Sequence, residues 1–217
     1  MLKIENLSIY GWEPAIRGMR NPLNSWEKSD SRYDYNGEYL VGENDLTLMR
    51  KLVAAGNDHS KFMRMITITC DITAPLYWWK EYDTYKVGTV ANSCSTMHTL
   101  TNKPFELSDF SLDQAEPLLP KYIDYLIETL NDLRDIIRNF DTVSDYACTT
   151  KKQVWQALIQ ILPESYNQRR TVHLNYAVAR NIYHSRRNHK LLEWHTLCDV
   201  FRALRYSDLI TGEVTPV

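Results

Sequence analysis

The residues from Leu118 to Phe140 carry the longest regular apolar pattern in the sequence. The apolar side chains recur at three- and four-residue steps, and they are Leu119, Tyr122, Ile123, Leu126, Ile127, Leu130, Leu133, Ile136 and Ile137. This spacing matches the period of an α-helix, and Pro120 is tolerated because it falls in the first turn. A helix with such a stripe needs a large partner surface, so the rest of the chain must supply one.

Shorter patterns predict one strand and several further helices. Residues 66–72 alternate apolar and polar side chains, which is typical of a half-buried strand. Asp45 is expected to cap a helix that ends near Gly56. Helical periods also cover Lys152 to Leu162, Arg169 to Ser185 and His189 to Leu204. The first 44 residues show no sustained period and are expected to be irregular.

The composition indicates an ordinary globular protein. The 217 residues are 44% hydrophobic and 24% charged, without internal repeats or low-complexity linkers. We therefore expect a single domain over residues 1–217, with an irregular N-terminal region (1–44), an α/β core (45–205) and a C-terminal tail (206–217). No apolar run reaches the length of a signal peptide or a membrane span, so we expect no membrane association and a cytoplasmic location.

Charge and cysteine spacing argue against several functional classes. The net charge is −2 and the pI is about 6.3, so we do not expect a nucleic-acid-binding protein. The cysteines form no CxxC pair of a zinc knuckle or a dithiol redox motif; they are Cys70, Cys94, Cys148 and Cys198. We also predict no metal site, because no HExxH pattern is present. The residues that can ligate a metal and that most resemble such a pattern are His184, His189, Glu193 and His195.

The segment from Ala74 to His98 combines aromatic residues with many hydroxyl, amide and thiol side chains. It is too polar for a buried element, and its aromatic side chains need a surface on which to pack. Such a segment suits a phosphorylated or planar polar ligand that is held by main-chain and hydroxyl donors. The alternative is an intersubunit contact loop in which Trp78 and Trp79 anchor the interface.

The order of these features resembles the flavin-dependent thymidylate synthases from Asp45 to Leu204. The resemblance is carried by a helix ending in "AGNDHS", a strand, "APLYWWKEYDTYKVGTVANSCS", the long helix, and "ILPESYNQRRTVHLNYAVARNIYHSRR". It implies an α/β fold with an antiparallel sheet flanked by long helices, assembled as a homotetramer whose sites form between subunits. It also implies FAD as the cofactor, and a transferase reaction in which reduced flavin passes a methylene and then a hydride to deoxyuridylate (dUMP).

The resemblance assigns roles to individual positions. Arg186 falls on an arginine that polarises the pyrimidine ring, and it is the predicted catalytic residue. The predicted cofactor-binding residues are His59, Thr84, Tyr85, Lys86, Asn175 and Asn181. The predicted substrate-binding residues are Arg17, Arg64, Glu81, Thr89, Asn92, Ser93, Cys94 and Ser95.

The family's Arg-His-Arg signature is not preserved and falls on Thr84, Tyr85 and Lys86. Arginine forks hold phosphates bidentately, so their loss removes much of the phosphate recognition. Arg17, Arg20 and Arg64 are available to rebuild it. Two hypotheses stay open: an enzyme that methylates or reduces a pyrimidine nucleotide with altered substrate recognition, and a non-catalytic homotetramer that binds a nucleotide or serves an interaction.

Several of these residues also have a structural interpretation. His59 follows a predicted helix end, where it can satisfy the last carbonyls. Asn175, Asn181 and Arg186 share one helical pattern and can form a polar network between packed helices. The sequence alone does not show a histidine that activates Cys94, so a catalytic thiol is unsupported.

Overall fold

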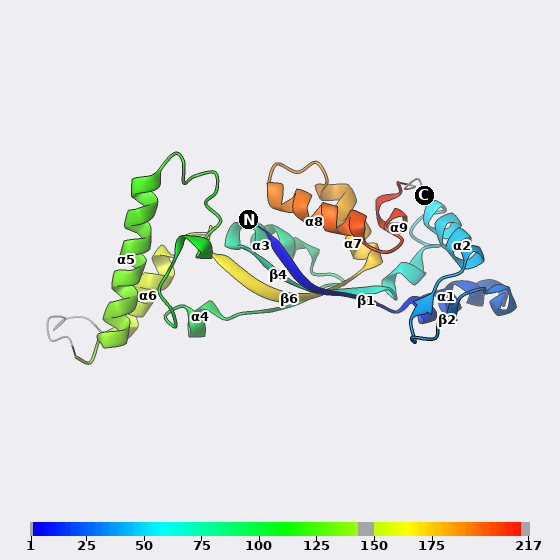
Figure 1. Ribbon diagram of the computed structural model, residues 1–217, viewed down its shortest axis with the longest axis horizontal. Helices are drawn as coiled ribbons and strands as arrows, with labels where there is room; N and C mark the ends of the chain where they lie inside the picture. The colour runs from blue at the N-terminus through cyan, green and yellow to red at the C-terminus, as the bar shows by residue number, and fades with distance from the viewer. Residues whose placement is uncertain (1, 143–149, 214–217) are drawn as a thin grey trace. The chain divides into compact units, whose positions relative to one another are not determined.

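The computed structural model describes residues 2–142 and 150–213. Its main sheet has the strand order β1-β4-β6-β5 (Figure 1). The strands are β1 (Lys3–Tyr10), β4 (Thr67–Pro75), β5 (Val90–Ser93) and β6 (Asn167–Asn175). Side-chain hydrogen bonds join Thr69 to His173 over 3.1 Å and Thr171 to Asp71 over 2.5 Å, so β4 and β6 run antiparallel. The predicted α/β fold with an antiparallel sheet and helices is confirmed.

A smaller sheet and a set of helices complete the described chain. The smaller sheet pairs β2 (Arg32–Tyr33) with β3 (Tyr39–Leu40) in antiparallel fashion. The longer helices are α1 (Trp12–Arg20), α2 (Glu43–Ala54), α3 (Leu76–Tyr82), α5 (Pro120–Asn139), α6 (Lys151–Ile161), α7 (Tyr176–Arg186) and α8 (Leu192–Ala203). The short ones are α4 (Thr96–Thr99), α9 (Asp208–Thr211) and the 3-10 turns η1 (Asn21–Leu23), η2 (Trp26–Lys28), η3 (Lys61–Arg64), η4 (Asp83–Tyr85) and η5 (Leu107–Asp109). Within the described ranges, no helix is both long and apolar enough to cross a membrane.

The chain forms two compact units, and strands β4 and β6 pass through both. Unit 1 comprises Met1–Lys3, Thr73–Asp83 and Ser93–Arg170, and unit 2 comprises Ile4–Ile72, Thr84–Asn92 and Thr171–Val217. The single-domain organisation stays a prediction. Cys148 and the last four residues of the expected C-terminal tail lie outside the described residues.

In unit 1, α5 packs against α6 around a hydrophobic core (Figure 1). The buried core residues are Leu100, Phe105, Phe110, Leu130, Ile137, Val154 and Leu158. A capping box starts α6, because the Thr150 hydroxyl accepts a hydrogen bond from the Gln153 amide over 3.3 Å. The long helix predicted from the apolar stripe is confirmed as α5, and the helix predicted over Lys152 to Leu162 is confirmed as α6.

The two tryptophans of α3 are core residues of unit 1. Trp78 and Trp79 are 0% and 1% exposed, and their ring centroids lie 4.9 Å apart. The Trp79 indole donates a hydrogen bond to the Gln168 carbonyl over 2.9 Å, and the Arg170 guanidinium lies 4.2 Å from the Trp79 ring centroid. The predicted role of these tryptophans as anchors of an intersubunit contact is wrong, because both rings are packed inside their own chain.

In unit 2, β4 has the predicted alternation of buried and half-buried residues. The helix predicted over Arg169 to Ser185 is wrong in its first half, where β6 replaces it. Val172 and Leu174 are buried there, and they alternate with the exposed side chains of Thr171 and His173. The period changes from two to 3.6 at the start of α7, and the sequence pattern conceals that change.

The ends of the chain are more regular than predicted. The expected irregular region over residues 1–44 contains β1 and α1, and α1 buries Trp12, Ile16 and Met19 along one face. The two elements meet at Gly11, whose φ of 92° and close approach to the Met65 carbonyl leave no room for a side chain. The expected tail contains the buried helix α9.

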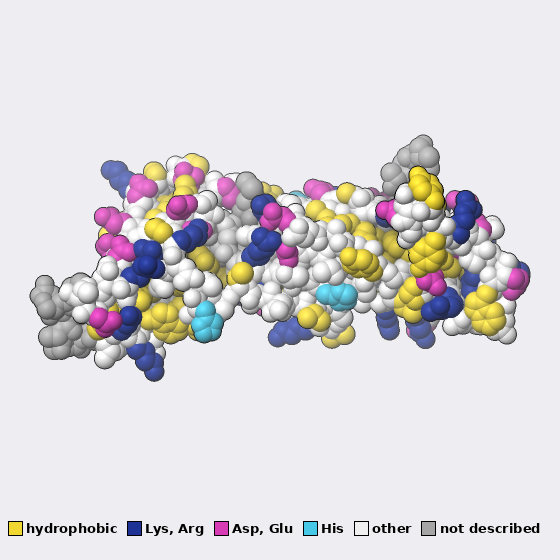
Figure 2. All heavy atoms as spheres, turned by 60° about the horizontal axis from the view of Figure 1, so that its bottom comes forward, with side chains coloured by type: hydrophobic (Ala, Val, Ile, Leu, Met, Phe, Trp, Pro, Cys, Tyr) yellow, Lys and Arg dark blue, Asp and Glu magenta, His cyan; other side chains and the backbone are white. Residues whose placement is uncertain are grey.

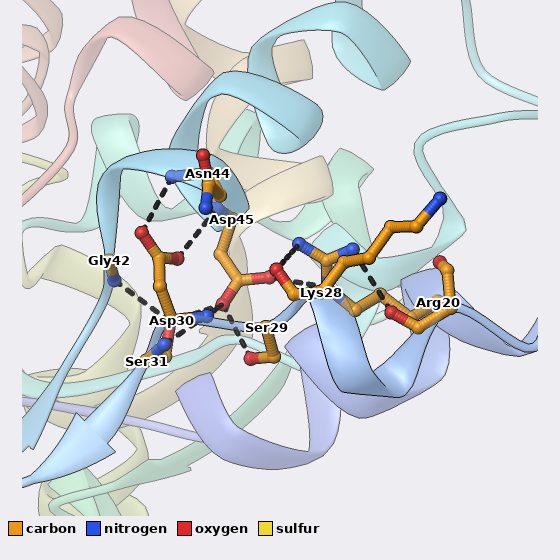
Figure 3. Close-up of polar contacts among 9 residues, drawn as sticks. Arg20, Lys28, Ser29, Asp30, Ser31, Gly42, Asn44 and Asp45 are labelled. Atoms are coloured by element: carbon orange, nitrogen blue, oxygen red, sulfur yellow. Dashed lines mark hydrogen bonds and ion pairs between the residues drawn. The ribbon is translucent and has the colours of Figure 1, made fainter.

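Asp45 does not cap α2 as predicted, since Gly42 is the N-cap residue. The Asp45 side chain is instead fully buried and accepts hydrogen bonds from Arg20 Nε, Ser29 Oγ and Ser31 Oγ over 2.6, 2.7 and 2.6 Å (Figure 3). This polar cluster joins α1 and the segment that follows it to α2.

Basic and acidic side chains are interspersed on the face shown in Figure 2. This mixing agrees with the small net charge of −2. A face of mixed sign does not provide the basic stripe by which proteins attract nucleic acid.

Candidate functional site

Unit 2 contains a cavity of about 630 Å³, here called the α7 cavity. Segments around η3 and η4 and the part of α7 from its N-cap Asn175 to His184 form its walls. The lining residues are Asn57, Ser60, Arg64, Thr84, Tyr85, Val87, Gly88, Asn175, Ala177, Val178, Arg180, Asn181 and His184. Sites for small molecules and cofactors typically have volumes of roughly 300–1,000 Å³. The α7 cavity is therefore large enough for such a ligand.

The end of β6 presents the start of α7 to the cavity. Asn175 is the N-cap residue, and its side-chain oxygen accepts a hydrogen bond from the Val178 amide over 3.0 Å. Asn175, Ala177 and Val178 all line the cavity. The positive end of the α7 dipole thus lies at the wall, where it favours a negatively charged ligand group.

Gly88 brings the segment after η4 close to α7. Its φ is +83°, and a Cβ at this position would lie 2.9 Å from Val178 Cγ2 and 3.4 Å from Asn175 Nδ2. Only glycine tolerates both the left-handed backbone and the short approach. The wall between η4 and α7 therefore depends on this residue.

Tyr85 is held in the cavity wall from behind. Arg186 Nε donates a hydrogen bond to the Tyr85 hydroxyl over 2.9 Å, and the Thr89 hydroxyl donates to the Tyr85 carbonyl over 2.7 Å. The Arg186 guanidinium lies 4.8 Å from the ring centroid of Trp194, which is fully buried. The Tyr85 and Trp194 rings meet edge to face with their centroids 5.9 Å apart. These contacts fix Tyr85 before any ligand arrives.

The basic ionisable side chains at the cavity wall are Arg64, Arg180 and His184. No carboxylate is among the lining residues in the described part of the chain. A concave site with cations and a helix N-terminus raises the local concentration of anions. The electrostatics of the α7 cavity therefore favour a phosphorylated ligand over a neutral or cationic one.

The C-terminal part of unit 2 engages Arg180, and His184 has a lowered pKa. Arg180 Nη1 donates hydrogen bonds to the carbonyls of Leu209 and Ile210 over 3.1 and 3.3 Å, and burial lowers the Arg180 pKa. Burial, and then the charges of Arg180 and Arg187, lower the pKa of His184. His184 therefore carries less positive charge at pH 7 than Arg180, whose charge also serves to hold α9.

The cavity brings together five of the residues predicted to bind cofactor or substrate. These are Arg64, Thr84, Tyr85, Asn175 and Asn181. His59 is exposed and lies in the chain between the lining residues Asn57 and Ser60, and Lys86 lies between Tyr85 and Val87. The binding roles of all these residues stay predictions.

The other predicted site residues do not line the α7 cavity. Arg186 lies behind Tyr85, and Arg17 on α1 has an ion pair with Glu13 over 3.5 Å. Thr89 and Asn92 belong to unit 2, and the remaining candidates, which belong to unit 1, are Glu81, Ser93, Cys94 and Ser95. The substrate-binding roles of these residues also remain predictions.

Sequence reasoning missed some of the polar wall. Asn57, Ser60 and Arg180 line the cavity without having been candidates, and His184 was considered only as a metal ligand. Ala177, Asn181 and His184 are spaced by four and three residues, so they share one face of α7. That signal is readable only once the start of α7 is known. No group of three or more His, Cys, Asp or Glu side chains is arranged to hold a metal ion in residues 2–142 and 150–213.

Among the solved structures that match this α/β fold are two from Helicobacter pylori. One is the flavin-dependent thymidylate synthase ThyX from Helicobacter pylori complexed with FAD and dUMP, with a TM-score of 0.68 and 17% identity over 97% of this chain and 98% of that chain. The other is thymidylate synthase X (ThyX) from Helicobacter pylori with FAD and dUMP, with a TM-score of 0.68 and 16% identity over 98% of both chains. No protein-family model and no curated protein sequence matches the chain. At this identity, the similarity establishes a ThyX-like fold.

The residues of the α7 cavity fit FAD by their chemistry. FAD combines planar ring systems with a pyrophosphate, so it needs flat packing surfaces, hydrogen-bond donors and positive charge. Tyr85 and Val87 supply apolar surface, and Asn57, Ser60 and Asn181 supply polar side chains. The basic wall without carboxylates suits the pyrophosphate.

Proposed function

We propose that the protein binds FAD and a pyrimidine nucleotide, with the α7 cavity as the binding site. The observation that carries the proposal is the cavity itself, in which basic and amide side chains converge without a carboxylate among the described lining residues. The fold similarity to ThyX structures with FAD and dUMP supports it, since both ligands occur on that fold.

In this proposal, the first turns of α7 and the segment after η4 hold the flavin. Asn175 and Asn181 lie on one wall and Thr84 and Tyr85 on another. An aromatic ring next to hydrogen-bond donors can stack on a planar ligand while the donors fix its orientation. His59 and Lys86, next to lining residues in the chain, complete the proposed set.

A bound flavin, once reduced by an external electron donor, would supply a hydride. In the enzyme we propose, that hydride and a proton would reduce the nucleotide, or, together with a methylene group from a one-carbon donor, would methylate it. The residues of the chain would bind both ligands and exclude water from them. The altered signature at Thr84, Tyr85 and Lys86 means that the nucleotide is recognised by a different set of contacts from that of the resembled family.

A second candidate is a non-catalytic protein that binds the same ligands. The observation that favours it is the position of Arg186, the predicted catalytic residue, whose guanidinium is engaged by Tyr85 and Trp194 and does not line the cavity. Binding without turnover would then be the function, in a homotetramer as the resemblance implies.

The absorption spectrum of the purified protein tests the proposal. After incubation with FAD and removal of the excess, we expect a retained flavin band, and we expect dUMP to perturb that band. Protein that retains no flavin and shows no response to dUMP would contradict the proposal. Retained flavin that yields no methylated or reduced nucleotide, even after a reductant for the flavin and a folate one-carbon donor are added, would favour the non-catalytic candidate.

A further inference from the structure

Arg64 differs from the other basic residues of the α7 cavity in having no structural task. It lies at the end of η3 and is exposed, and no hydrogen bond or ion pair joins its guanidinium to another residue in the described ranges. An arginine that lines a cavity and keeps its five donors available is suited to bind an anion.

The two other basic residues of the wall do not compete for this role. Arg180 uses Nη1 to hold the carbonyls of Leu209 and Ile210, so moving it toward a ligand would break these bonds. Burial lowers the pKa of His184, so this side chain carries less positive charge at pH 7 than the Arg64 guanidinium does. Among the basic side chains of the described wall, Arg64 therefore combines a full positive charge with donors that are available to a ligand.

Polar neighbours in the wall can complete an anion site around Arg64. Asn57 and Ser60 come from the same short stretch of chain, and Asn181 comes from α7. A guanidinium fork with amide and hydroxyl donors beside it matches the oxygen atoms of a phosphate ester. No carboxylate lines the described wall to compete for the fork.

We propose that Arg64 is the specificity-determining residue that makes the α7 cavity select phosphorylated ligands over their unphosphorylated counterparts. The proposal rests on the proposed function, because it assigns a phosphate of FAD or of the nucleotide to this side chain. Arg64 would supply the bidentate contact that Thr84 and Lys86 do not.

Matched ligand pairs test the proposal and separate the two sources of the phosphate. Binding of FAD, FMN and riboflavin is measured by flavin fluorescence, and binding of dUMP and deoxyuridine by calorimetry, for wild type and Arg64→Ala. FMN and riboflavin differ by one phosphate, as dUMP and deoxyuridine do. A charge-assisted phosphate contact is worth about a 10- to 100-fold preference, which Arg64→Ala should abolish in one pair. Arg64→Lys should restore part of it, because lysine keeps the charge without the fork.

Arg32→Ala provides the matched control, because Arg32 is an exposed arginine of β2 that does not line the cavity. It should leave both preferences unchanged. Arg64 is itself exposed, so its variants should keep the wild-type melting temperature. If wild type prefers the phosphorylated ligands and Arg64→Ala keeps that preference, the role of Arg64 is overturned and the proposed function stands. If wild type binds neither FAD nor dUMP, both are overturned.

Discussion

Arg186 donates a hydrogen bond from Nε to the hydroxyl of Tyr85 over 2.9 Å, which ties the last turn of α7 to the wall of the α7 cavity. The Arg186 guanidinium also lies 4.8 Å from the centroid of the buried Trp194 ring. The resemblance to a known enzyme family places Arg186 at the substrate, whereas these contacts place it behind a residue that lines the cavity. Arg186 would then contribute to ligand binding indirectly, because it holds the Tyr85 side chain in its orientation.

Arg186→Ala should therefore weaken FAD binding about tenfold, because the hydrogen bond to Tyr85 and the cation–π contact with Trp194 are together worth about 1–2 kcal/mol. Tyr85→Phe keeps the ring and should have a smaller effect. Arg32→Ala is the control, since Arg32 is an exposed arginine of β2 that does not line the cavity. Fluorescence titration with FAD measures all of them, and unchanged affinity in Arg186→Ala would contradict the positioning role.

Gly88→Ala should lower both stability and FAD affinity. The new Cβ would lie 2.9 Å from Val178 Cγ2 on a backbone with φ of +83°, so the cavity wall must shift. Gly37→Ala is a close control, because Gly37 has φ of +82° with nothing within 4 Å of a Cβ. Backbone strain should lower the free energy of unfolding of both variants by about 1 kcal/mol, and urea unfolding measures this loss. Only Gly88→Ala should lose flavin affinity, and equal affinities in the two variants would contradict this account of the wall.

Asp45→Asn should destabilise the fold by about 3–5 kcal/mol, because it leaves the Arg20 charge buried without its partner. Glu43→Gln, which removes an exposed carboxylate 3.8 Å from Arg50, should change the free energy of unfolding little. Urea unfolding of the two variants makes the comparison. A small loss in Asp45→Asn would show that the buried cluster does not hold α1 to α2.

The same cluster predicts an acid-sensitive stability. Burial raises the Asp45 pKa, but hydrogen bonds from Ser29, Ser31 and Arg20 outweigh it and lower that pKa below the ordinary aspartate value. Asp45 therefore binds a proton more tightly in the unfolded chain than in the folded one. Its contribution to the free energy of unfolding is complete above the ordinary aspartate pKa, and it is lost as the pH falls through the lowered pKa of the folded state. Asp45→Asn should flatten this part of the stability profile. If the free energy of unfolding of Asp45→Asn falls with decreasing pH as steeply as that of wild type, other carboxylates cause the acid sensitivity.

In the expected homotetramer, α5 should contact a second copy of the chain. Leu118 and Leu119, just before this helix, and Tyr122 and Tyr125 within it are 78%, 55%, 62% and 66% exposed in the single chain. Tyr122→Lys with Tyr125→Lys should lower the mass measured by light scattering and leave the melting temperature unchanged. Tyr35→Lys, at a side chain that is 96% exposed, is the control. A monomeric wild-type chain would contradict the prediction outright.

The parts of the fold that depend on local periodicity could be predicted from the sequence. The apolar stripe of α5 and the alternation of β4 are long enough to reveal their elements. The sequence predicts a helix in place of β6, because the short alternation at Val172 and Leu174 is followed at once by the helical spacing of α7. The sequence does not reveal β1 and α1, because burial along β1 does not alternate with a period of two and Gly11 separates the strand from the helix.

The candidate site depends on contacts between distant parts of the chain, which periodicity does not encode. The order of motifs pointed to Thr84, Tyr85, Asn175 and Asn181, and all four line the α7 cavity. It could not reveal that Arg186 binds the Tyr85 hydroxyl, since that contact joins residues 101 positions apart. Nor could it reveal that Arg180 is engaged by α9 while Arg64 is not, because both are simply arginines in the sequence.

The most direct test of the central claim is a titration of FAD against protein whose cavity has been filled. Ala177 lines the α7 cavity, and Ala203, an exposed residue at the end of α8, does not. We predict that wild type and Ala203→Trp retain a stoichiometric amount of flavin, whereas Ala177→Trp folds with a normal melting temperature and retains none. Flavin binding that is equally strong in Ala177→Trp, or absent from wild type, would contradict the assignment of the α7 cavity as the flavin site.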